Sequence, residues 1–186
     1  PHCMVFSADG TRLAARIDAK TVKLWRVDDA AELTELPLER NKGFTMAFSP
    51  DGRSILTGAA LFGAEGWENV LVLRESDTGN EVSTHSEPAH AFIHALAFAP
   101  DGASVAIGTD ATVSLWDAAK WQKQAEFAAP IYYPRTLAFS PDGALIASGS
   151  DDSTVRVWTV ADGAGGEPVV LAGHSDWVNA VAFSPD

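Results

Sequence analysis

A short motif recurs five times along the chain and constrains the fold more than any other feature. It reads Phe, a small residue, Pro or Ala, and then Asp-Gly, as in "FSPDG", and its last copy stops at "FSPD". Self-similarity at a period of roughly 20–50 residues is typical of solenoids, propellers and arrays, so the chain is predicted to be a repeat protein. The copies begin at Phe6, Phe48, Phe98, Phe139 and Phe183, with spacings of 42, 50, 41 and 44 residues.

The fourth copy and the residues after it show what one repeat encodes. Ser140–Gly143 is a tight-turn sequence, because Pro141 favours a φ of about −65° and Gly143 tolerates the left-handed conformation that closes a hairpin. Residues 154–158 alternate as a strand does, and a glycine-rich turn separates them from the short apolar segment 168–173. Each repeat is therefore predicted to form four short antiparallel strands.

The third predicted strand of each repeat ends on a large side chain. Trp25, Trp116 and Trp158 hold this place in repeats one, three and four, whereas repeat two has Arg74 there and extra residues within 60–69. A four-stranded sheet cannot bury both of its faces alone. Stacking several such sheets around an axis does so and produces a β-propeller.

Two stretches, "FSPDGALIASGSDDSTVRVW" from Phe139 and "LAGHSDWVNAVAFSPD" from Leu171, resemble WD40 repeats. They are similar to repeats of large bacterial multidomain proteins, where such propellers follow kinase, protease-like or NTPase regions. The resemblance implies an all-β propeller of WD40 type with about four four-stranded blades and the first strand of a fifth, as part of a larger propeller. The expected blades are residues 1–37, 38–87, 88–128 and 129–172, with the fifth starting at 173–186.

The resemblance also implies a hydrogen-bond network of His, Ser or Thr, Asp and Trp that stiffens each blade. Repeat three matches this pattern best, repeat four matches it in part, and the fifth copy supplies only its His. The residues expected in the network are His90, Thr109, Asp110, Trp116, Asp152, Trp158 and His174.

Composition and motifs argue against several classes of function. The formal charge of −12 disfavours a nucleic-acid partner, and no apolar run is long enough to span a membrane. The single cysteine, Cys3, cannot form an internal disulfide, which favours a reducing, cytoplasmic location. His85, His90 and His94 lack the spacing of a known metal site, and no phosphate-binding loop or nucleophile elbow is present. We therefore expect no catalytic residue, cofactor or metal.

One position of the repeat favours surface recognition. The resemblance places the residues six before each Phe on the top face of the ring, and three of four are aromatic, the residue type that anchors many interfaces. Tyr132 and Arg135 flank this site. The residues at the repeated position are Lys42, Phe92, Tyr133 and Trp177.

Trp67, in the insertion of repeat two, has two interpretations. On an acidic, aromatic loop of the top face it would contact a basic peptide. Alternatively, the insertion is a longer loop folded over its own blade, with Trp67 filling the gap left where Arg74 replaces Trp.

The predicted function is a non-catalytic scaffold that binds a protein or peptide through the top face, and the exposed end strands also allow self-association. One alternative is a propeller enzyme with a hydrolase or lactonase site in the pore. The side chains expected there, Phe44, His94, Arg135 and Asn179, do not make a metal-ligand set. The other alternative is a purely structural segment of a larger signalling protein.

Overall fold

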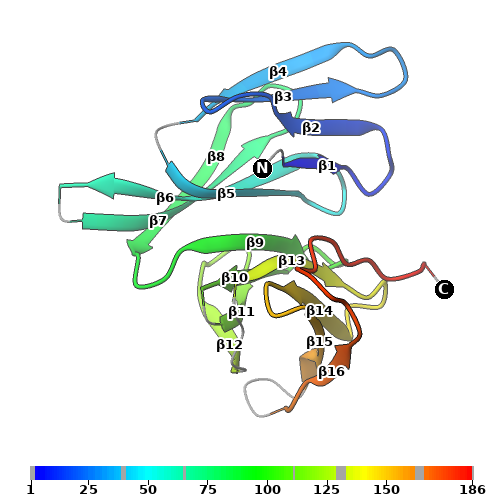
Figure 1. Cartoon of the computed structure of the whole chain (residues 1–186). Coiled ribbons are helices and arrows are strands. Elements are labelled where there is room, and N and C mark those ends of the chain that lie inside the picture. The colour runs from blue at the N-terminus through cyan, green and yellow to red at the C-terminus, as the bar shows by residue number, and fades with distance from the viewer. Residues whose placement is uncertain are drawn as a thin grey trace. The chain divides into compact units, whose positions relative to one another are not determined.

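The computed structural model divides into two compact units, which we call unit 1 (Pro1–Phe92) and unit 2 (Ile93–Asp186). Each unit is described by itself (Figure 1). In the described part of the chain, no helix is long and apolar enough to cross a membrane. The structure describes residues 3–38, 41–64, 66–110, 112–128, 133–161 and 166–185.

Unit 1 consists of two antiparallel four-stranded sheets, each a meander in which sequence neighbours pair. Blade one contains β1 (Met4–Phe6), β2 (Arg12–Arg16), β3 (Thr21–Arg26) and β4 (Glu32–Pro37). Blade two contains β5 (Asn41–Phe48), β6 (Ser54–Gly63), β7 (Gly66–Glu75) and β8 (Glu81–Pro88).

Unit 2 repeats this arrangement, so the prediction of an all-β chain with four four-stranded antiparallel sheets is confirmed. The sequence predicted the first strand of a fifth blade after β16, but the described residues there form no strand. In every other repeat the first strand is paired with the second strand of the same repeat. Blade three contains β9 (Ile93–Phe98), β10 (Ser104–Thr109), β11 (Thr112–Asp117) and β12 (Lys123–Ala128). Blade four contains β13 (Pro134–Phe139), β14 (Leu145–Ser150), β15 (Thr154–Thr159) and β16 (Val169–Ala172).

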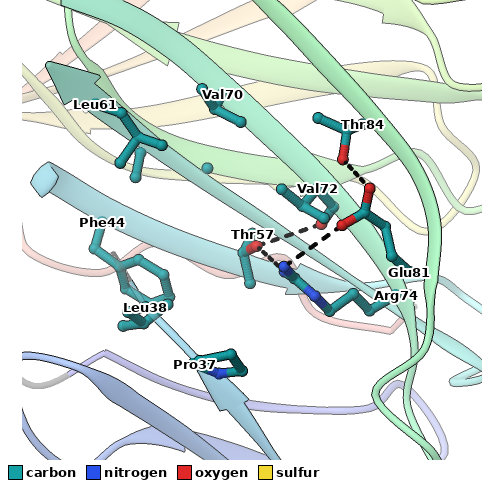
Figure 2. A pocket seen from close by; sticks show the side chains of 12 residues that line it. Pro37, Leu38, Phe44, Thr57, Leu61, Val70, Val72, Arg74, Glu81 and Thr84 are labelled. Carbon is teal, nitrogen blue, oxygen red and sulfur yellow. Dashed lines mark hydrogen bonds and ion pairs between the residues drawn. The ribbon is translucent and has the colours of Figure 1, made fainter. Parts of the chain in front are cut away.

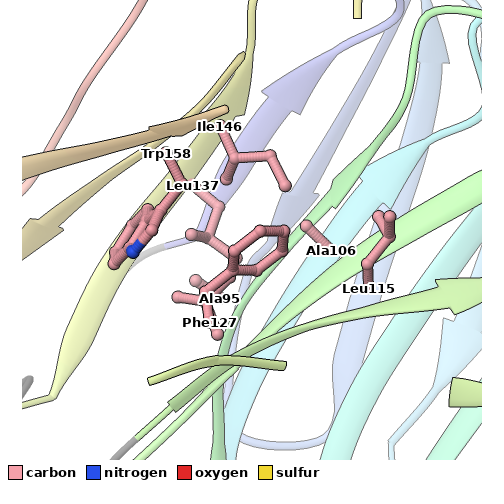
Figure 3. Close-up of a cluster of buried hydrophobic side chains, with 8 residues drawn as sticks. Ala95, Ala106, Leu115, Phe127, Leu137, Ile146 and Trp158 are labelled. Carbon is pink, nitrogen blue, oxygen red and sulfur yellow. The ribbon is translucent and has the colours of Figure 1, made fainter. Parts of the chain in front are cut away.

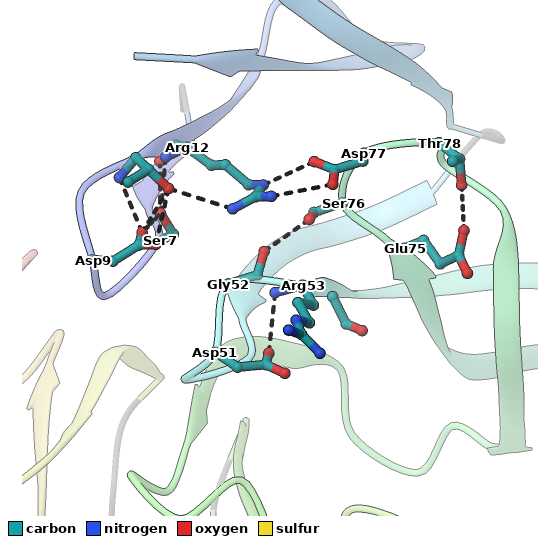
Figure 4. Close-up of polar contacts among 12 residues, drawn as sticks. Ser7, Asp9, Arg12, Asp51, Gly52, Arg53, Glu75, Ser76, Asp77 and Thr78 are labelled. Atoms are coloured by element: carbon teal, nitrogen blue, oxygen red, sulfur yellow. Dashed lines mark hydrogen bonds and ion pairs between the residues drawn. The ribbon is translucent and has the colours of Figure 1, made fainter. Parts of the chain in front are cut away.

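The recurring motif is a self-contained turn between the first two strands of a blade (Figure 4). In blade one, the Ser7 hydroxyl donates to Asp9 at 2.6 Å, and Asp9 accepts the Thr11 amide at 3.0 Å. The Gly10 amide donates to the Ser7 carbonyl, and Gly10 has a φ of 70°, which glycine adopts without steric cost. Ser49–Gly52 and Ser140–Gly143 form the same turn, so the motif fixes where each hairpin reverses.

These turns predict a specific pH dependence. The hydrogen bond from Ser7, followed by the Thr11 amide, lowers the pKa of Asp9 from 3.8 to about 2. Because the folded-state pKa is depressed, this carboxylate stabilises the fold above about pH 4, and its contribution is lost as the pH falls through about 2. Replacing Ser7 by Ala should raise the pKa of Asp9 toward 3.8, measured by NMR titration of the side-chain carboxyl carbon. Ser140→Ala is the control, and a shift of Asp9 in that variant would contradict a local cause.

The insertion of blade two extends two strands and does not form the longer loop that one interpretation required. The register continues to the hairpin end, with Leu61 opposite Glu68, Phe62 opposite Trp67 and Gly63 opposite Gly66. The rings of Phe62 and Trp67 meet edge to face at 5.3 Å, a cross-strand contact that stabilises the longer pairing.

The core of each unit lies between its two blades, as expected for sheets that cannot bury both faces alone. In unit 2, Phe127 of β12 packs against Trp158 of β15, with ring centroids 6.0 Å apart (Figure 3). In unit 1, Leu36 of β4 and Ile55 of β6 belong to one buried cluster. Arg12 and Asp77 also join the two blades of unit 1 through paired hydrogen bonds of 2.9 and 3.1 Å (Figure 4).

Candidate functional surface

Two pairs of polar side chains occupy equivalent places in blades three and four. His94 and Arg135 each lie four residues before the Phe that ends the first strand, and Asp110 and Asp151 each lie twelve residues after it. The imidazole Nε2 of His94 is 2.5 Å from Asp110 Oδ1. The Arg135 guanidinium donates to both carboxylate oxygens of Asp151. Each blade of unit 2 therefore joins its first strand to the turn after its second strand at the same point.

Two large aromatic rings lie against these pairs. The Tyr133 ring meets the His94 ring edge to face at 5.2 Å, and the Arg135 guanidinium lies 4.0 Å from the centroid of a Trp177 ring. The Tyr133 and Trp177 side chains remain 48% and 54% exposed. Cations over aromatic faces attract by about 0.5–1 kcal/mol at exposed sites. We call His94, Asp110, Tyr133, Arg135, Asp151 and Trp177 the aromatic–cation cluster.

The backbone fixes where Tyr133 projects. Tyr133 has a φ of 50°, an unusual conformation for a residue other than glycine and one that costs on the order of 1–3 kcal/mol. Its amide donates to the Asp110 carbonyl at 3.5 Å, and its carbonyl accepts the Asp151 amide at 3.4 Å. Tyr133 is thus held between the turns of blades three and four, which offsets the strain.

The other predicted surface residues lie in unit 1 or outside the described residues. Trp67 and Phe92 meet edge to face at 5.5 Å, and Phe62 extends this aromatic group toward solvent. The group belongs to the extended hairpin of blade two and the segment that follows the blade. Lys42 lies on β5, but its side chain, like all of Tyr132, falls outside the described residues.

The expected network of blade three has different partners in the structure. Asp110 pairs with His94, while His90 is exposed and makes no side-chain hydrogen bond among the described residues. The Trp116 indole donates to Ser114 at 2.8 Å, and the Thr109 hydroxyl lies 3.2 Å from that of Thr112. His94 and Ser114 are therefore the contacts that the sequence pattern missed.

Blade four has the Ser, Asp and Trp of the expected network, but the structure does not join them. Asp152 accepts hydrogen bonds from Thr154 within its own turn and pairs with Arg156 at 2.7 Å. Trp158 Nε1 and Ser148 Oγ are both buried and have no hydrogen-bond partner among the described residues. His174 lies exposed after β16. The Trp158 ring acts in this blade through packing.

The spacing of the repeat carried the signal for the missed contacts. Arg135 lies four residues before Phe139, and His94 lies four residues before Phe98. Each has an acidic residue sixteen positions later in the chain, and each forms a pair with it. Comparing repeats for matched cation and acid positions would have identified both pairs.

The charged and polar side chains of the cluster are already paired with one another. Among the described residues, no group of three or more His, Cys, Asp or Glu side chains could hold a metal ion. The Arg135 guanidinium is already hydrogen-bonded to Asp151, and it also donates a hydrogen bond to Asn179 Oδ1 at 3.4 Å. The cluster presents two aromatic rings to solvent, Tyr133 in contact with His94 and Trp177 in contact with Arg135.

Comparison with known proteins identifies the class to which these sheets belong. The family model described as "WD domain, G-beta repeat" (WD40) matches residues 80–117, 128–159 and 166–186. The chain therefore contains WD40 repeats, and the two sheets of unit 2 are blades of WD40 type. WD40 domains are in general non-catalytic scaffolds for protein interactions.

A curated relative extends this similarity over most of the chain. Apoptotic protease-activating factor 1 of Danio rerio is 26% identical over 176 residues, which cover 94% of this chain. The aligned region is 13% of that protein's length, so the chain corresponds to a small part of it.

Proposed function

We propose that this chain is a non-catalytic scaffold that binds a protein or peptide on the aromatic–cation cluster of unit 2. The observation that carries the proposal is the pair of half-exposed rings, Tyr133 and Trp177, each in contact with a side chain that is itself ion-paired. Large aromatic residues dominate the binding energy of many interfaces. Rings that are already fixed lose little conformational entropy on binding, which favours affinity.

The charge of the cluster favours a protein partner over a nucleic acid. Arg135 is ion-paired with Asp151 and is not free to neutralise a phosphate. The whole chain also carries a formal charge of −12. Nucleic-acid affinity depends on releasing counterions from phosphates to basic side chains. A peptide with apolar or basic side chains suits two rings beside carboxylates better.

The aromatic group of unit 1 is a second surface within the same proposal. Phe62 is exposed on the hairpin of blade two, and Trp67 and Phe92 support it. Cross-strand packing within the hairpin accounts for much of this group, so we expect it to contribute less than the cluster of unit 2.

The proposal predicts that binding depends on the two exposed rings of unit 2. Tyr133→Ala and Trp177→Ala should each weaken partner binding about 30-fold, the effect of losing a hot-spot residue worth ~2 kcal/mol. The measurement is affinity capture by the purified chain, followed by quantitative mass spectrometry and by titration of each captured partner.

The matched control is Phe6→Ala, because Phe6 is 53% exposed, lies in unit 1 and is outside both aromatic groups. It should leave partner binding unchanged. Circular dichroism confirms that each variant is folded. If both unit 2 variants fold and retain every partner with native affinity, the aromatic–cation cluster is not the binding surface.

A further inference from the structure

A pocket of about 410 Å³ lies in unit 1 between the end of blade one and the face of blade two (Figure 2). Its volume falls within the range of about 300–1,000 Å³ that is typical of small-molecule sites. Leu38, Phe44 and Leu61 provide apolar walls, while Thr57 and Arg74 bring polar groups into it. None of its lining residues belongs to the aromatic–cation cluster or to the aromatic group of unit 1.

Unit 1 lacks two rings that unit 2 packs together at the equivalent place between its blades. Arg74 pairs with Ile55 as Trp158 pairs with Ile146, so Arg74 occupies the position of the Trp. Leu36 likewise occupies the position of Phe127 on the last strand of the preceding blade. Of the two residues that replace these rings, Leu36 is buried in the core of unit 1 and Arg74 lines the pocket.

Arg74 carries a partly buried charge whose hydrogen-bonding capacity is mostly unused. Its side chain is only 16% exposed, and burial lowers its pKa. A guanidinium has five N–H donors, and among the described residues Arg74 uses one nitrogen, donating from Nη1 to Thr57 at 3.3 Å. Glu81 lies 3.9 Å from Nη2, beyond hydrogen-bond distance, and its carboxylate also accepts the Thr84 hydroxyl at 2.6 Å.

The unused donors of the Arg74 guanidinium lower the stability of the fold unless a ligand accepts hydrogen bonds from them. Retaining a desolvated cation with unused donors destabilises a fold, and an apolar side chain of similar size would often be neutral or stabilising. The neighbouring exposed Glu81 compensates in part, at long range. An anion that entered the pocket would satisfy the remaining donors with the bidentate geometry that guanidinium groups favour for carboxylates.

We propose that this pocket binds an organic carboxylate with an apolar body. The carboxylate pairs with the Arg74 guanidinium beside Thr57, and the apolar body lies against Phe44 and Leu38. Glu81 turns to solvent, where its side chain is already largely exposed. The same chemistry is found in a free small carboxylic acid and in the C-terminus of a peptide that ends in an aliphatic residue.

The test is a titration of hexanoate into the ¹⁵N-labelled chain, followed by the amide signals of Thr57, Gly58 and Val72. We expect saturable shifts with a Kd on the order of 1 mM, as suits a ligand of this size. Hexanol has the same apolar chain without the charge and should bind at least tenfold more weakly. Equal binding of hexanol and hexanoate, or no saturable shift with hexanoate, would overturn the proposal.

Two substitutions test the role of the guanidinium. Arg74→Met retains the length of the side chain and should weaken hexanoate binding at least tenfold, while Arg74→Lys keeps the charge but loses the planar fork and should give an intermediate affinity. The control is Arg53→Met, because Arg53 is exposed and does not line the pocket. Native affinity in folded Arg74→Met would overturn the assignment.

A further comparison distinguishes the two sources of the carboxylate. A short peptide ending in Leu is titrated with a free C-terminus and with an amidated one. If the free-acid peptide binds at least tenfold more tightly than hexanoate, and the amide does not, the natural ligand is a protein C-terminus. If hexanoate binds more tightly than either peptide, it is a small carboxylic acid.

Discussion

Replacing Trp158 by Ala is expected to lower the free energy of unfolding by about 3–5 kcal/mol, the cost typical of removing a buried Trp. Trp158 is 1% exposed and is the largest fully buried side chain among the described residues. It packs against Phe127, Leu137 and Ile146, which come from three different strands of two blades. The substitution would therefore leave a cavity at the junction of blades three and four.

Two matched variants separate packing from other effects of Trp158. Trp158→Phe keeps a ring beside Phe127 and removes an N–H that has no partner among the described residues. It should therefore lower the free energy of unfolding by less than Trp158→Ala does. Trp177→Ala removes the same type of side chain from an exposed position and should lower the free energy of unfolding by no more than about 1 kcal/mol. Urea denaturation followed by circular dichroism measures all three. Equal costs for Trp158→Ala and Trp177→Ala would show that the blade junction is not the core.

The sequence predicted the features of the fold that depend on local interactions. The turn at Ser140–Gly143 is closed by hydrogen bonds within a few residues, so its motif alone locates the hairpin. The strands follow because each turn fixes the register of the strands beside it, as the pairing of Phe139 with Ile146 and of Phe98 with Val105 illustrates. This is why the number and order of strands could be derived without coordinates.

Side-chain partners were less predictable because they depend on competition between neighbours in space. Asp110 is reached by His94 from the adjacent strand, whereas His90 is exposed and belongs to unit 1. Trp116 has Ser114 two residues before it on the same strand, while the equivalent place before Trp158 is held by Arg156. One substitution in a neighbouring position is thus enough to redirect a hydrogen bond.

Arg74, which stands where the other repeats have Trp, illustrates both what the sequence predicts and what requires the structure. Its position in the repeat was evident from the sequence, and the loss of a packing residue could be inferred there. That the guanidinium keeps a hydrogen bond to Thr57, the strand-two residue in the place of Ser148, required the structure. Blade two has therefore exchanged a packed indole for a polar group beside a pocket, and Trp67 does not line that pocket.

A methyl group should be poorly tolerated at Gly149. A Cβ built there would lie 2.7 Å from Val178 Cγ1, 2.8 Å from the Val178 carbonyl oxygen and 2.9 Å from Thr136. The backbone carbonyl cannot rotate away as a side chain can. Gly149→Ala should lower the free energy of unfolding by about 1–3 kcal/mol through overpacking, measured by urea denaturation.

The expected consequence reaches the proposed binding surface. Val178 is buried and donates its amide to the Ser150 carbonyl at 3.0 Å, and it is flanked by Trp177 and Asn179, both contacts of Arg135. Displacing Val178 should speed hydrogen exchange of its amide and weaken partner binding, although Gly149 would touch no partner. Gly63→Ala is the control, because its Cβ would meet only the flexible end of Glu68 among side chains, at 3.3 Å. Unchanged exchange at Val178 in Gly149→Ala would mean that the segment after β16 does not depend on this contact.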